Sequence, residues 1–215
     1  MSDAKLREEM CEVAASIYRR GLTGGSSGNI SARTEDGGLL VSPTGTSFGY
    51  LDPARLSLLD GSGRHVSGDP PTKEMPLHAA FYETRAGTGA VVHLHSSYAV
   101  ALSMLPDIDP DNVLPPLTAY SIMRCGRVKL LPYFRPGDPA MGDAVRALGG
   151  KRIAVILANH GPVVAGKDLT SALYATEELE ETAKLAILTR GMGALALTDW
   201  QVNDIVTAFD VEWEA

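Results

Sequence analysis

The chain has 215 residues, of which 45% are apolar and 21% charged, an ordinary globular composition for one sizeable core. Its formal net charge is −7 and it has no dense run of lysine and arginine, so nucleic acid is not an expected partner. No stretch approaches the ~18 apolar residues of a membrane span, and two cysteines cannot form a disulfide framework. The charged N-terminus also lacks the apolar stretch of a signal peptide, so we expect a cytoplasmic protein away from membranes.

The first half of the chain is predicted to begin with an amphipathic helix. Apolar residues recur there at three- and four-residue steps, and Gly21 is placed to end the helix. A second helix is predicted from about residue 72 to 85, with Pro76 tolerated in its first turn. Between these helices, short strands separated by Asp-Gly and Gly-Gly turns are expected at residues 30–33, 39–41 and 56–59.

The second half alternates buried strands with helices. Residues 106–139 carry seven prolines and are predicted to be largely loop. Strands are expected at residues 90–95, 128–133 and 152–158. Helices are expected at residues 97–105, 138–148, 168–189 and 198–209. This interleaving predicts an α/β protein, with a mixed sheet covered by helices on both faces, in a single domain over residues 1–215.

The strongest local motif is VVHLHS, at the end of a predicted strand. Side chains alternate along a strand, so His93 and His95 project to the same side and can share one cation. Taken alone, the pair fits two satisfied core or edge histidines at least as well. His160 makes a metal site the better interpretation, because it ends a second buried strand where the chain is expected to enter a Gly-Pro turn at residues 161–162. Three ligands with one open position are common in catalytic metal sites.

Glu74 is the candidate carboxylate beside these histidines. It lies at the start of the second predicted helix, where simple helix capping is the competing interpretation. His78 lies one turn further on and could face Glu74, and we expect it to have a structural role. His65, beside a glycine-rich hairpin, is expected on the surface.

Two glycine-opened loops are candidates for holding a phosphate. SSGNIS and SPTGTSFG each combine backbone amides with hydroxyl or amide side chains, and the helix start can add a hydroxyl and a cation. Such loops are more often ordinary turns, so each is a weak signal. The candidate phosphate-binding residues are Gly28, Asn29, Thr44, Gly45, Thr72 and Lys73.

Taken in order, these motifs resemble the class II aldolase/adducin family over nearly the whole chain. The matching segments are GNIS at 28–31, SPTG at 42–45, the helix of Glu74, HLH at 93–95 and NHG at 159–161. The resemblance implies a three-layer α/β/α sandwich around a mixed β-sheet, assembled as a homotetramer with sites at subunit interfaces. It further implies that the three histidines hold one Zn²⁺ per subunit, with Mn²⁺ or Co²⁺ as alternatives.

The resemblance also implies roles for the remaining candidates. Glu74 would act as acid/base, and the two loops with Thr72 and Lys73 would cradle a substrate phosphate. Sugar-phosphate aldolases of the family tend to carry Ser-Ser at the latter position, so Thr72-Lys73 is a departure that leaves the phosphate contacts there open. Tyr120, Arg124 and Arg135 are candidates for recognising a carboxylate or completing a neighbouring subunit's site, or for structural roles.

Within the family, three segments look most like the 3-oxo-tetronate 4-phosphate decarboxylases: residues 44–53, 71–78 and 115–139. This similarity implies a small phosphorylated sugar acid as substrate and a lyase reaction in carbohydrate metabolism. Alternatives are a fuculose 1-phosphate aldolase, a pentulose-phosphate 4-epimerase and a metal-free binding module like the adducin head. The last tyrosine, Tyr174, precedes the C-terminal tail, which counts against an epimerase, and the retained histidines count against a binding module.

Overall fold

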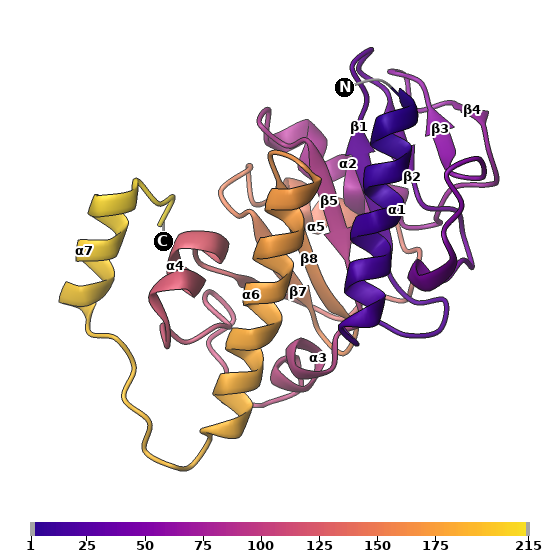
Figure 1. Cartoon of the computed structure of the whole chain (residues 1–215). Coiled ribbons are helices and arrows are strands. Elements are labelled where there is room, and N and C mark those ends of the chain that lie inside the picture. Colours follow the sequence, from indigo (N-terminus) through magenta and orange to yellow (C-terminus); the bar gives the residue numbers. More distant parts are fainter. Residues whose placement is uncertain (1–2, 214–215) are drawn as a thin grey trace.

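The computed structural model describes residues 3–213, in which helices and strands alternate along the chain (Figure 1). The helices are α1 Asp3–Arg19, the short 3₁₀ helix η1 Phe48–Tyr50, α2 Met75–Thr84, α3 Ser97–Ser103, α4 Ala119–Cys125, α5 Ala140–Arg146, α6 Leu169–Leu188 and α7 Asp199–Phe209. The strands are β1 Asn29–Arg33, β2 Leu39–Val41, β3 Ser57–Leu59, β4 His65–Ser67, β5 Ala90–His93, β6 Lys129–Leu131, β7 Ala154–Leu157 and β8 Gly161–Gly166.

The strands of the described chain form one mixed sheet in the order β4-β3-β2-β1-β5-β8-β7-β6. Neighbouring strands run antiparallel except for β6 and β7, which are parallel. The middle of the sheet joins distant parts of the chain, because β5 pairs with β1 on one side and with β8 on the other. In this register Asn29 lies opposite His93, and His93 lies opposite Val163.

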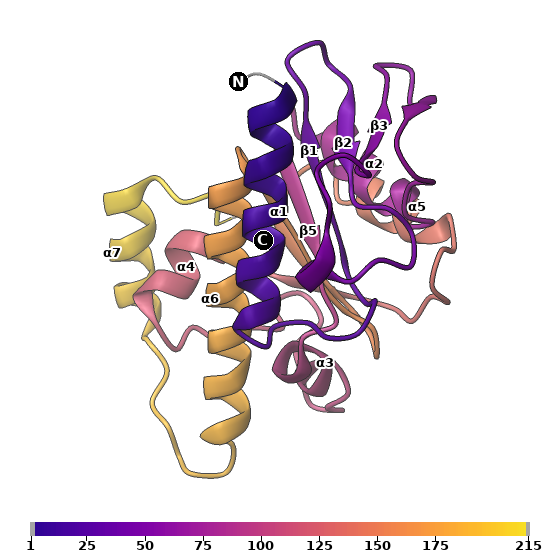
Figure 2. The same cartoon turned by 45° about the vertical axis from the view of Figure 1, so that its right-hand side comes forward.

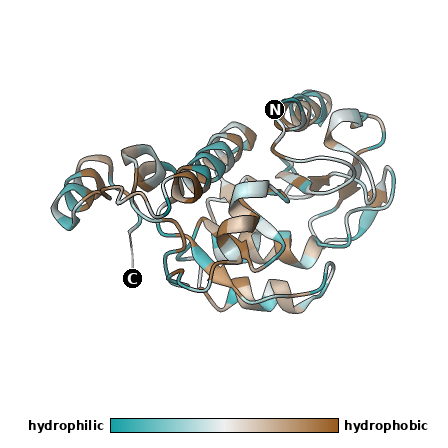
Figure 3. Cartoon of the chain, turned by 90° about the horizontal axis from the view of Figure 1, so that it is seen from below, coloured by the Kyte–Doolittle hydropathy of each residue, from teal (hydrophilic) through white to brown (hydrophobic). Residues whose placement is uncertain are grey.

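Helices cover both faces of the sheet, which confirms the predicted three-layer arrangement (Figures 1 and 2). On one face α1, α3, α4 and α6 bury residues of alternate strand positions, among them Ile30, Val92 and Ile156. On the other face α2 and α5 pack against the opposite set, which includes Val91 and Val155. The helices carry both hydrophilic and hydrophobic residues along their ribbons in Figure 3, as expected of amphipathic helices that border a core.

Local sequence signals account for the starts of two helices in the second half. Asp168 begins α6 by accepting a hydrogen bond from the Ser171 amide, and Thr198 forms a capping box with Gln201 at the start of α7. The central strands β5 and β7 are buried at every position, which explains their continuous apolar sequences.

Three predictions about the second half were wrong in part. The proline-rich segment 106–139 contains a helix, α4, which Thr118 caps by accepting from the Ser121 amide. The Gly161-Pro162 pair was expected as a turn but begins strand β8, because Pro162 needs no amide donor where it pairs with Ile156. The strand expected at residues 90–95 also ends two residues earlier, at His93.

Helix α7 lies well away from α1 in Figure 1, and it packs beside α4, as Figures 1 and 2 both show. The long segment that connects it to α6 leaves Met192 and Leu195 exposed, and Trp200 is exposed on α7 itself. Within residues 3–213, no helix is both long and apolar enough to cross a membrane.

Candidate metal centre and active site

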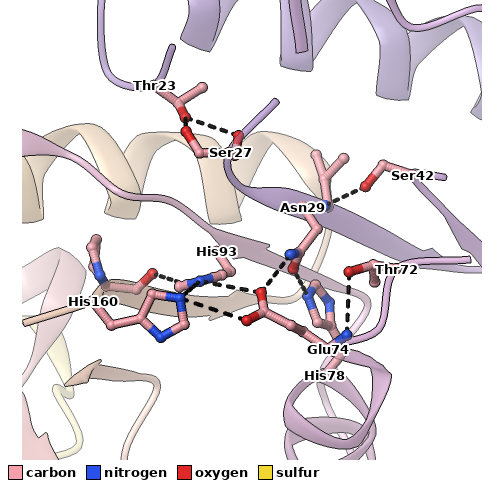
Figure 4. Close-up of polar contacts among 11 residues, drawn as sticks. Thr23, Ser27, Asn29, Ser42, Thr72, Glu74, His78, His93 and His160 are labelled. Atoms are coloured by element: carbon pink, nitrogen blue, oxygen red, sulfur yellow. Dashed lines mark hydrogen bonds and ion pairs between the residues drawn. The ribbon is translucent and has the colours of Figure 1, made fainter. Parts of the chain in front are cut away.

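Three histidines meet at one end of the central strands. His93 ends β5, His95 follows two residues later, and His160 lies in the tight connection between β7 and β8. Their rings are 4.7–5.1 Å apart between centroids, each pair in an edge-on or T-shaped contact. The pairing of β5 with β8 therefore brings together ligands from distant parts of the sequence (Figure 4).

The geometry of these histidines fits a divalent cation. One ligand atom from each ring lies within 4.8 Å of the others, and the Nε2 atoms of His93 and His160 are 3.4 Å apart. Two nitrogens bound at about 2.0–2.1 Å to a tetrahedral ion would lie about 3.4 Å apart. His93 Nδ1 is 2.9 Å from the Pro162 carbonyl oxygen, so its N–H donates there and leaves the Nε2 lone pair for a metal.

The protonation states also suit metal binding. Burial lowers the pKa of His93 to about 3, and burial likewise lowers the pKa values of His95 and His160. The imidazoles are therefore neutral near pH 7, and neutral imidazole is the form that coordinates a cation.

Glu74 faces the same point from the start of α2. Its Oε2 lies 3.4 Å from His93 Nε2, and its Oε1 lies 3.5 Å from His160 Nε2. Burial raises the pKa of Glu74, but His93 and the hydrogen bond from Asn29 outweigh that effect and lower the pKa overall. The side chain makes no capping hydrogen bond to α2, so the helix-capping interpretation is wrong.

The turn that carries His160 has a constrained backbone. Asn159 has a φ of 57°, in the left-handed region that asparagine tolerates, and its amide donates to Ser103 Oγ at 3.0 Å. Gly161 has a φ of 150°, and a Cβ there would lie 2.0 Å from the Leu94 carbonyl oxygen. Asparagine and glycine therefore flank His160 because the chain passes so close to the segment between His93 and His95.

Glu180, on α6, holds the chain just after His95, a contact that the sequence analysis missed. Its buried carboxylate accepts hydrogen bonds from Ser96 Oγ at 2.6 Å and from the amides of Tyr98 and Ala99 at 2.8 and 2.9 Å. These donors belong to the first turn of α3, so Glu180 ties this turn to α6. The available signal was an acidic residue within the apolar stripe of a long helix.

A cavity of about 290 Å³ opens beside the histidines and Glu74. It brings together all six residues that were expected to bind phosphate, with Glu74 and His95 in the same lining. Gly28 and Gly45 have φ values of 84° and 71°, which turns the two loops toward this space. Lys73 is the only lysine or arginine among the described residues that line the cavity.

The three peripheral candidates do not join this cavity. Arg135 is exposed and lies 3.4 Å from Asp138, next to Pro136 and Gly137 of the cavity lining. Tyr120 and Arg124 belong to α4 and line a separate surface hollow with Tyr174 of α6. The Arg124 guanidinium lies over the Tyr174 ring at 5.4 Å, a contact that joins α4 to α6.

Asn29 and His78 complete the surroundings of Glu74. Asn29 Nδ2 donates to Glu74 Oε2 at 2.7 Å, and His78 Nε2 contacts Asn29 Oδ1 (Figure 4). His78 is fully buried, as its expected structural role requires, whereas His65 is exposed on β4.

Comparison with known proteins identifies relatives along almost the whole chain. The Class II Aldolase and Adducin N-terminal domain family matches residues 8–187. A 3-oxo-tetronate 4-phosphate decarboxylase of Haemophilus influenzae is 46% identical, over 95% of this chain and 98% of that protein. The L-fuculose phosphate aldolase of Escherichia coli is 31% identical, over 93% of this chain and 88% of the aldolase.

A solved structure agrees with these sequence matches. The crystal structure of YgbL from Klebsiella pneumoniae superposes with a TM-score of 0.92 and is 44% identical, covering 95% of this chain and 99% of that one. The domain match, the sequence identities and the shared architecture lead to one conclusion: the chain belongs to the class II aldolase/adducin family.

Proposed function

We propose that this protein is a metal-dependent carboxy-lyase that converts a 3-oxo-tetronate 4-phosphate to dihydroxyacetone phosphate and CO₂. The observation that carries the proposal is a cluster of three histidines that reaches, through His95, a cavity lined also by Glu74 and by glycine-opened loops. The 46% identity to a decarboxylase of this specificity, over nearly both full chains, selects the reaction. The aldolase relative is more distant, at 31% identity.

The chemistry of the substrate explains why this site suits the reaction. The ketone lies β to the carboxylate, so the electron pair of the broken carbon–carbon bond is delocalised onto the ketone oxygen when CO₂ departs. The product is an enediolate, the same one that a retro-aldol cleavage of a ketose 1-phosphate leaves. A divalent cation held by the three histidines would supply Lewis-acid stabilisation of this negative charge.

Glu74 completes the reaction by proton transfer. It stands beside the histidines and at the cavity, where its Oε1 is a buried atom without a hydrogen-bond partner among residues 3–213. We assign to it the delivery of a proton to the hydroxyl-bearing carbon of the enediolate, which yields dihydroxyacetone phosphate. Because its lowered pKa leaves Glu74 ionised at rest, the carboxylate takes up this proton from solvent before it passes it on.

The loops of the cavity lining would anchor the phosphate. Backbone amides at Gly28 and Gly45, the Thr44 and Thr72 hydroxyls and the Lys73 ammonium are the donors available there. Fixing the phosphate in the cavity that Glu74 also lines would hold the reacting carbons still, which lowers the entropic part of the barrier.

Three finer properties stay predictions. Three imidazoles with a nearby carboxylate favour Zn²⁺ as the native ion, with Mn²⁺ and Co²⁺ as alternatives, one per subunit. A homotetramer is supported by the exposed apolar residues on and before α7, which a monomer would leave in water. A single domain and a cytoplasmic location are the expectations from the sequence alone.

The deciding experiment is a product assay on metal-loaded protein. We would supply 3-oxo-tetronate 4-phosphate labelled at the carboxylate, with fuculose 1-phosphate in a parallel reaction. Label released faster than the spontaneous rate, and blocked by a chelator, is the expected result. Aldehyde release from the sugar phosphate without label release would instead establish an aldolase, since both reactions make dihydroxyacetone phosphate.

A further inference from the structure

A buried polar seam runs between β1 and α2, behind Glu74. On the strand, Asn29 and Ser31 are two residues apart, and on the helix side Glu74, His78 and Tyr82 follow at steps of four. Two residues of strand rise about 6.6 Å and four of helix about 6.0 Å, so the two rows stay in step. Every residue of the seam is buried, with Tyr82 the most exposed at 8%.

The seam is connected without a gap. Tyr82 Oη lies 2.9 Å from Ser31 Oγ, and Ser31 Oγ lies 2.7 Å from His78 Nδ1. His78 Nε2 contacts Asn29 Oδ1, and Asn29 Nδ2 lies 2.7 Å from Glu74 Oε2. The seam therefore forms one hydrogen-bonded chain that ends on the carboxylate at the cavity.

The direction of this chain follows from its far end. Among the hydrogen bonds of residues 3–213, Ser31 is the single partner of the Tyr82 hydroxyl, and the other group at that ring is the Arg33 guanidinium, which cannot accept. A buried hydroxyl hydrogen left without an acceptor costs about 1–3 kcal/mol. Tyr82 therefore donates to Ser31, and Ser31 must pass its own hydrogen to His78 Nδ1.

The remaining hydrogens are then determined. Burial lowers the pKa of His78 to about 4, so the ring is neutral and carries one N–H. With Nδ1 accepting from Ser31, that hydrogen resides on Nε2 and is donated to Asn29 Oδ1. The Asn29 amide cannot flip without facing its NH₂ group to the His78 N–H, so its other end donates to Glu74.

We infer that His78 is a positioning residue for the reaction: its Nε2–H locks the Asn29 amide, which in turn holds the Glu74 carboxylate at the cavity. The inference rests on the proposed role of Glu74 as the proton donor. Glu74 needs such a support, because it precedes the first residue of α2 and makes no capping bond to that helix. In this arrangement the Asn29 side chain positions Glu74, a role other than the phosphate binding expected from the sequence.

The packing of β1 against α2 does not by itself require a row of buried polar residues. Each buried polar group must be paired to avoid a desolvation penalty, so an apolar seam would satisfy packing more simply. The hydrogen-bonded chain ends at the Glu74 carboxylate. A role in positioning this reacting group explains why polar residues are kept here despite the desolvation penalty.

The test compares two replacements of His78. His78→Phe keeps a buried ring but removes the donor, and we expect kcat to fall about ten- to hundredfold with little change in KM. In His78→Gln the side-chain N–H can reach Asn29, so part of the lost kcat should return. His65→Phe, at an exposed histidine of β4, is the matched control and should leave both constants unchanged.

A second measurement addresses the hydrogen positions directly and does not need turnover. In metal-loaded protein labelled with ¹⁵N at histidine rings, the signals lost in His78→Gln identify His78. We expect Nε2 to be protonated and Nδ1 unprotonated. Tyr82→Phe, which removes one distant hydroxyl, should disturb these signals and lower kcat less than His78→Phe does.

Three results would overturn the inference: unchanged kcat in His78→Phe, no recovery in His78→Gln, or a hydrogen on His78 Nδ1. The ring signals keep the test separate from the proposed function. If the wild-type protein released no CO₂, the decarboxylase assignment would fail, while the ring signals would still decide the direction of the chain. If His78→Phe did not fold, Tyr82→Phe and the wild-type spectrum would carry the test.

Discussion

The two sides of the cavity are built differently. On the side of the reaction, His93 is fully buried and Glu74 is 7% exposed, and both are held by hydrogen bonds to other buried groups. On the side of the expected phosphate, the residues come from turns, with Gly28 and Gly45 at positive φ and Lys73 exposed to solvent. The first, the rigid side, is buried and hydrogen-bonded, whereas the second, the loop side, consists largely of exposed turns.

This difference separates two tasks. Groups that stabilise charge or move protons in the transition state must be in place beforehand, since reorganising them would add to the barrier. Groups that hold a phosphate can adjust as the substrate arrives, because amides and a flexible cation tolerate some variation in geometry. Substitutions on the rigid side should therefore change kcat, and substitutions on the loop side should change KM.

The largest effect is expected from His95→Ala. His95 is the exposed member of the three histidines, so its truncation removes a ligand without opening a cavity in the core. Loss of Lewis-acid stabilisation worth several kcal/mol should lower turnover by about 10⁴-fold or more, and stoichiometric metal should be lost. Metal analysis and a turnover assay check this, with His65→Ala as control, and full metal content in His95→Ala would contradict the assignment.

Glu74→Gln should come next. The amide keeps the shape of the side chain but cannot deliver a proton, so kcat should fall about 10²- to 10⁴-fold while metal content stays near that of the wild type. Steady-state kinetics with metal analysis separates this from ligand loss. Turnover within a few-fold of the wild type would remove Glu74 from the mechanism.

Protonation of His78 at low pH should lower the free energy of unfolding. The pKa of this buried imidazole is about 4 when folded, below its usual 6.5, so the unfolded chain binds the proton more readily. Its contribution to stability is complete above about pH 6.5 and is lost as the pH falls toward 4, by roughly 3 kcal/mol.

This pH dependence can be measured by urea unfolding of metal-free protein between pH 4 and 7. His78→Gln should flatten the loss of stability across that range, whereas His65→Gln should not. An equal slope in the wild type and His78→Gln would show that other groups cause the acid sensitivity.

The smallest of these effects is expected on the loop side. Lys73→Met removes the one cation of the cavity lining, and a hydrogen bond to a charged group contributes about 1.5–3 kcal/mol. KM should therefore rise roughly ten- to hundredfold, with kcat changed much less. Lys167→Met, at an exposed lysine away from this cavity, is the control. A fall in kcat without a rise in KM would erase the contrast between the two sides.

Much of the fold and the candidate site could be predicted from the sequence, because those signals are local. The alternation of His93 and His95, the strand end at His160 and the periodic helices all depend on a few neighbouring residues. Helix α4 was missed because prolines surround it, although Thr118 at its start is an ordinary capping residue. Strand β8 was missed because its Gly-Pro start imitates a turn.

The contacts behind the site could not be predicted in the same way. The hydrogen bonds from Asn29 to Glu74 and from Ser96 to Glu180 join residues 45 and 84 positions apart. A trace of the polar seam was present, since N-x-S on the strand and E-x-x-x-H-x-x-x-Y on the helix follow the two periods. Nothing in either pattern alone says that the strand and the helix face each other.

The pairing of β5 with β8 has a thermodynamic consequence. His93 and His160 are 67 residues apart in the chain and meet only when these strands are joined in register. An unfolded chain cannot present the three imidazoles together, so an ion that binds them binds the native state almost alone. Free metal at a thousand times its dissociation constant would then add about 4 kcal/mol to the free energy of unfolding. The metal supply of the cell would thus govern the lifetime of the folded protein as well as its chemistry.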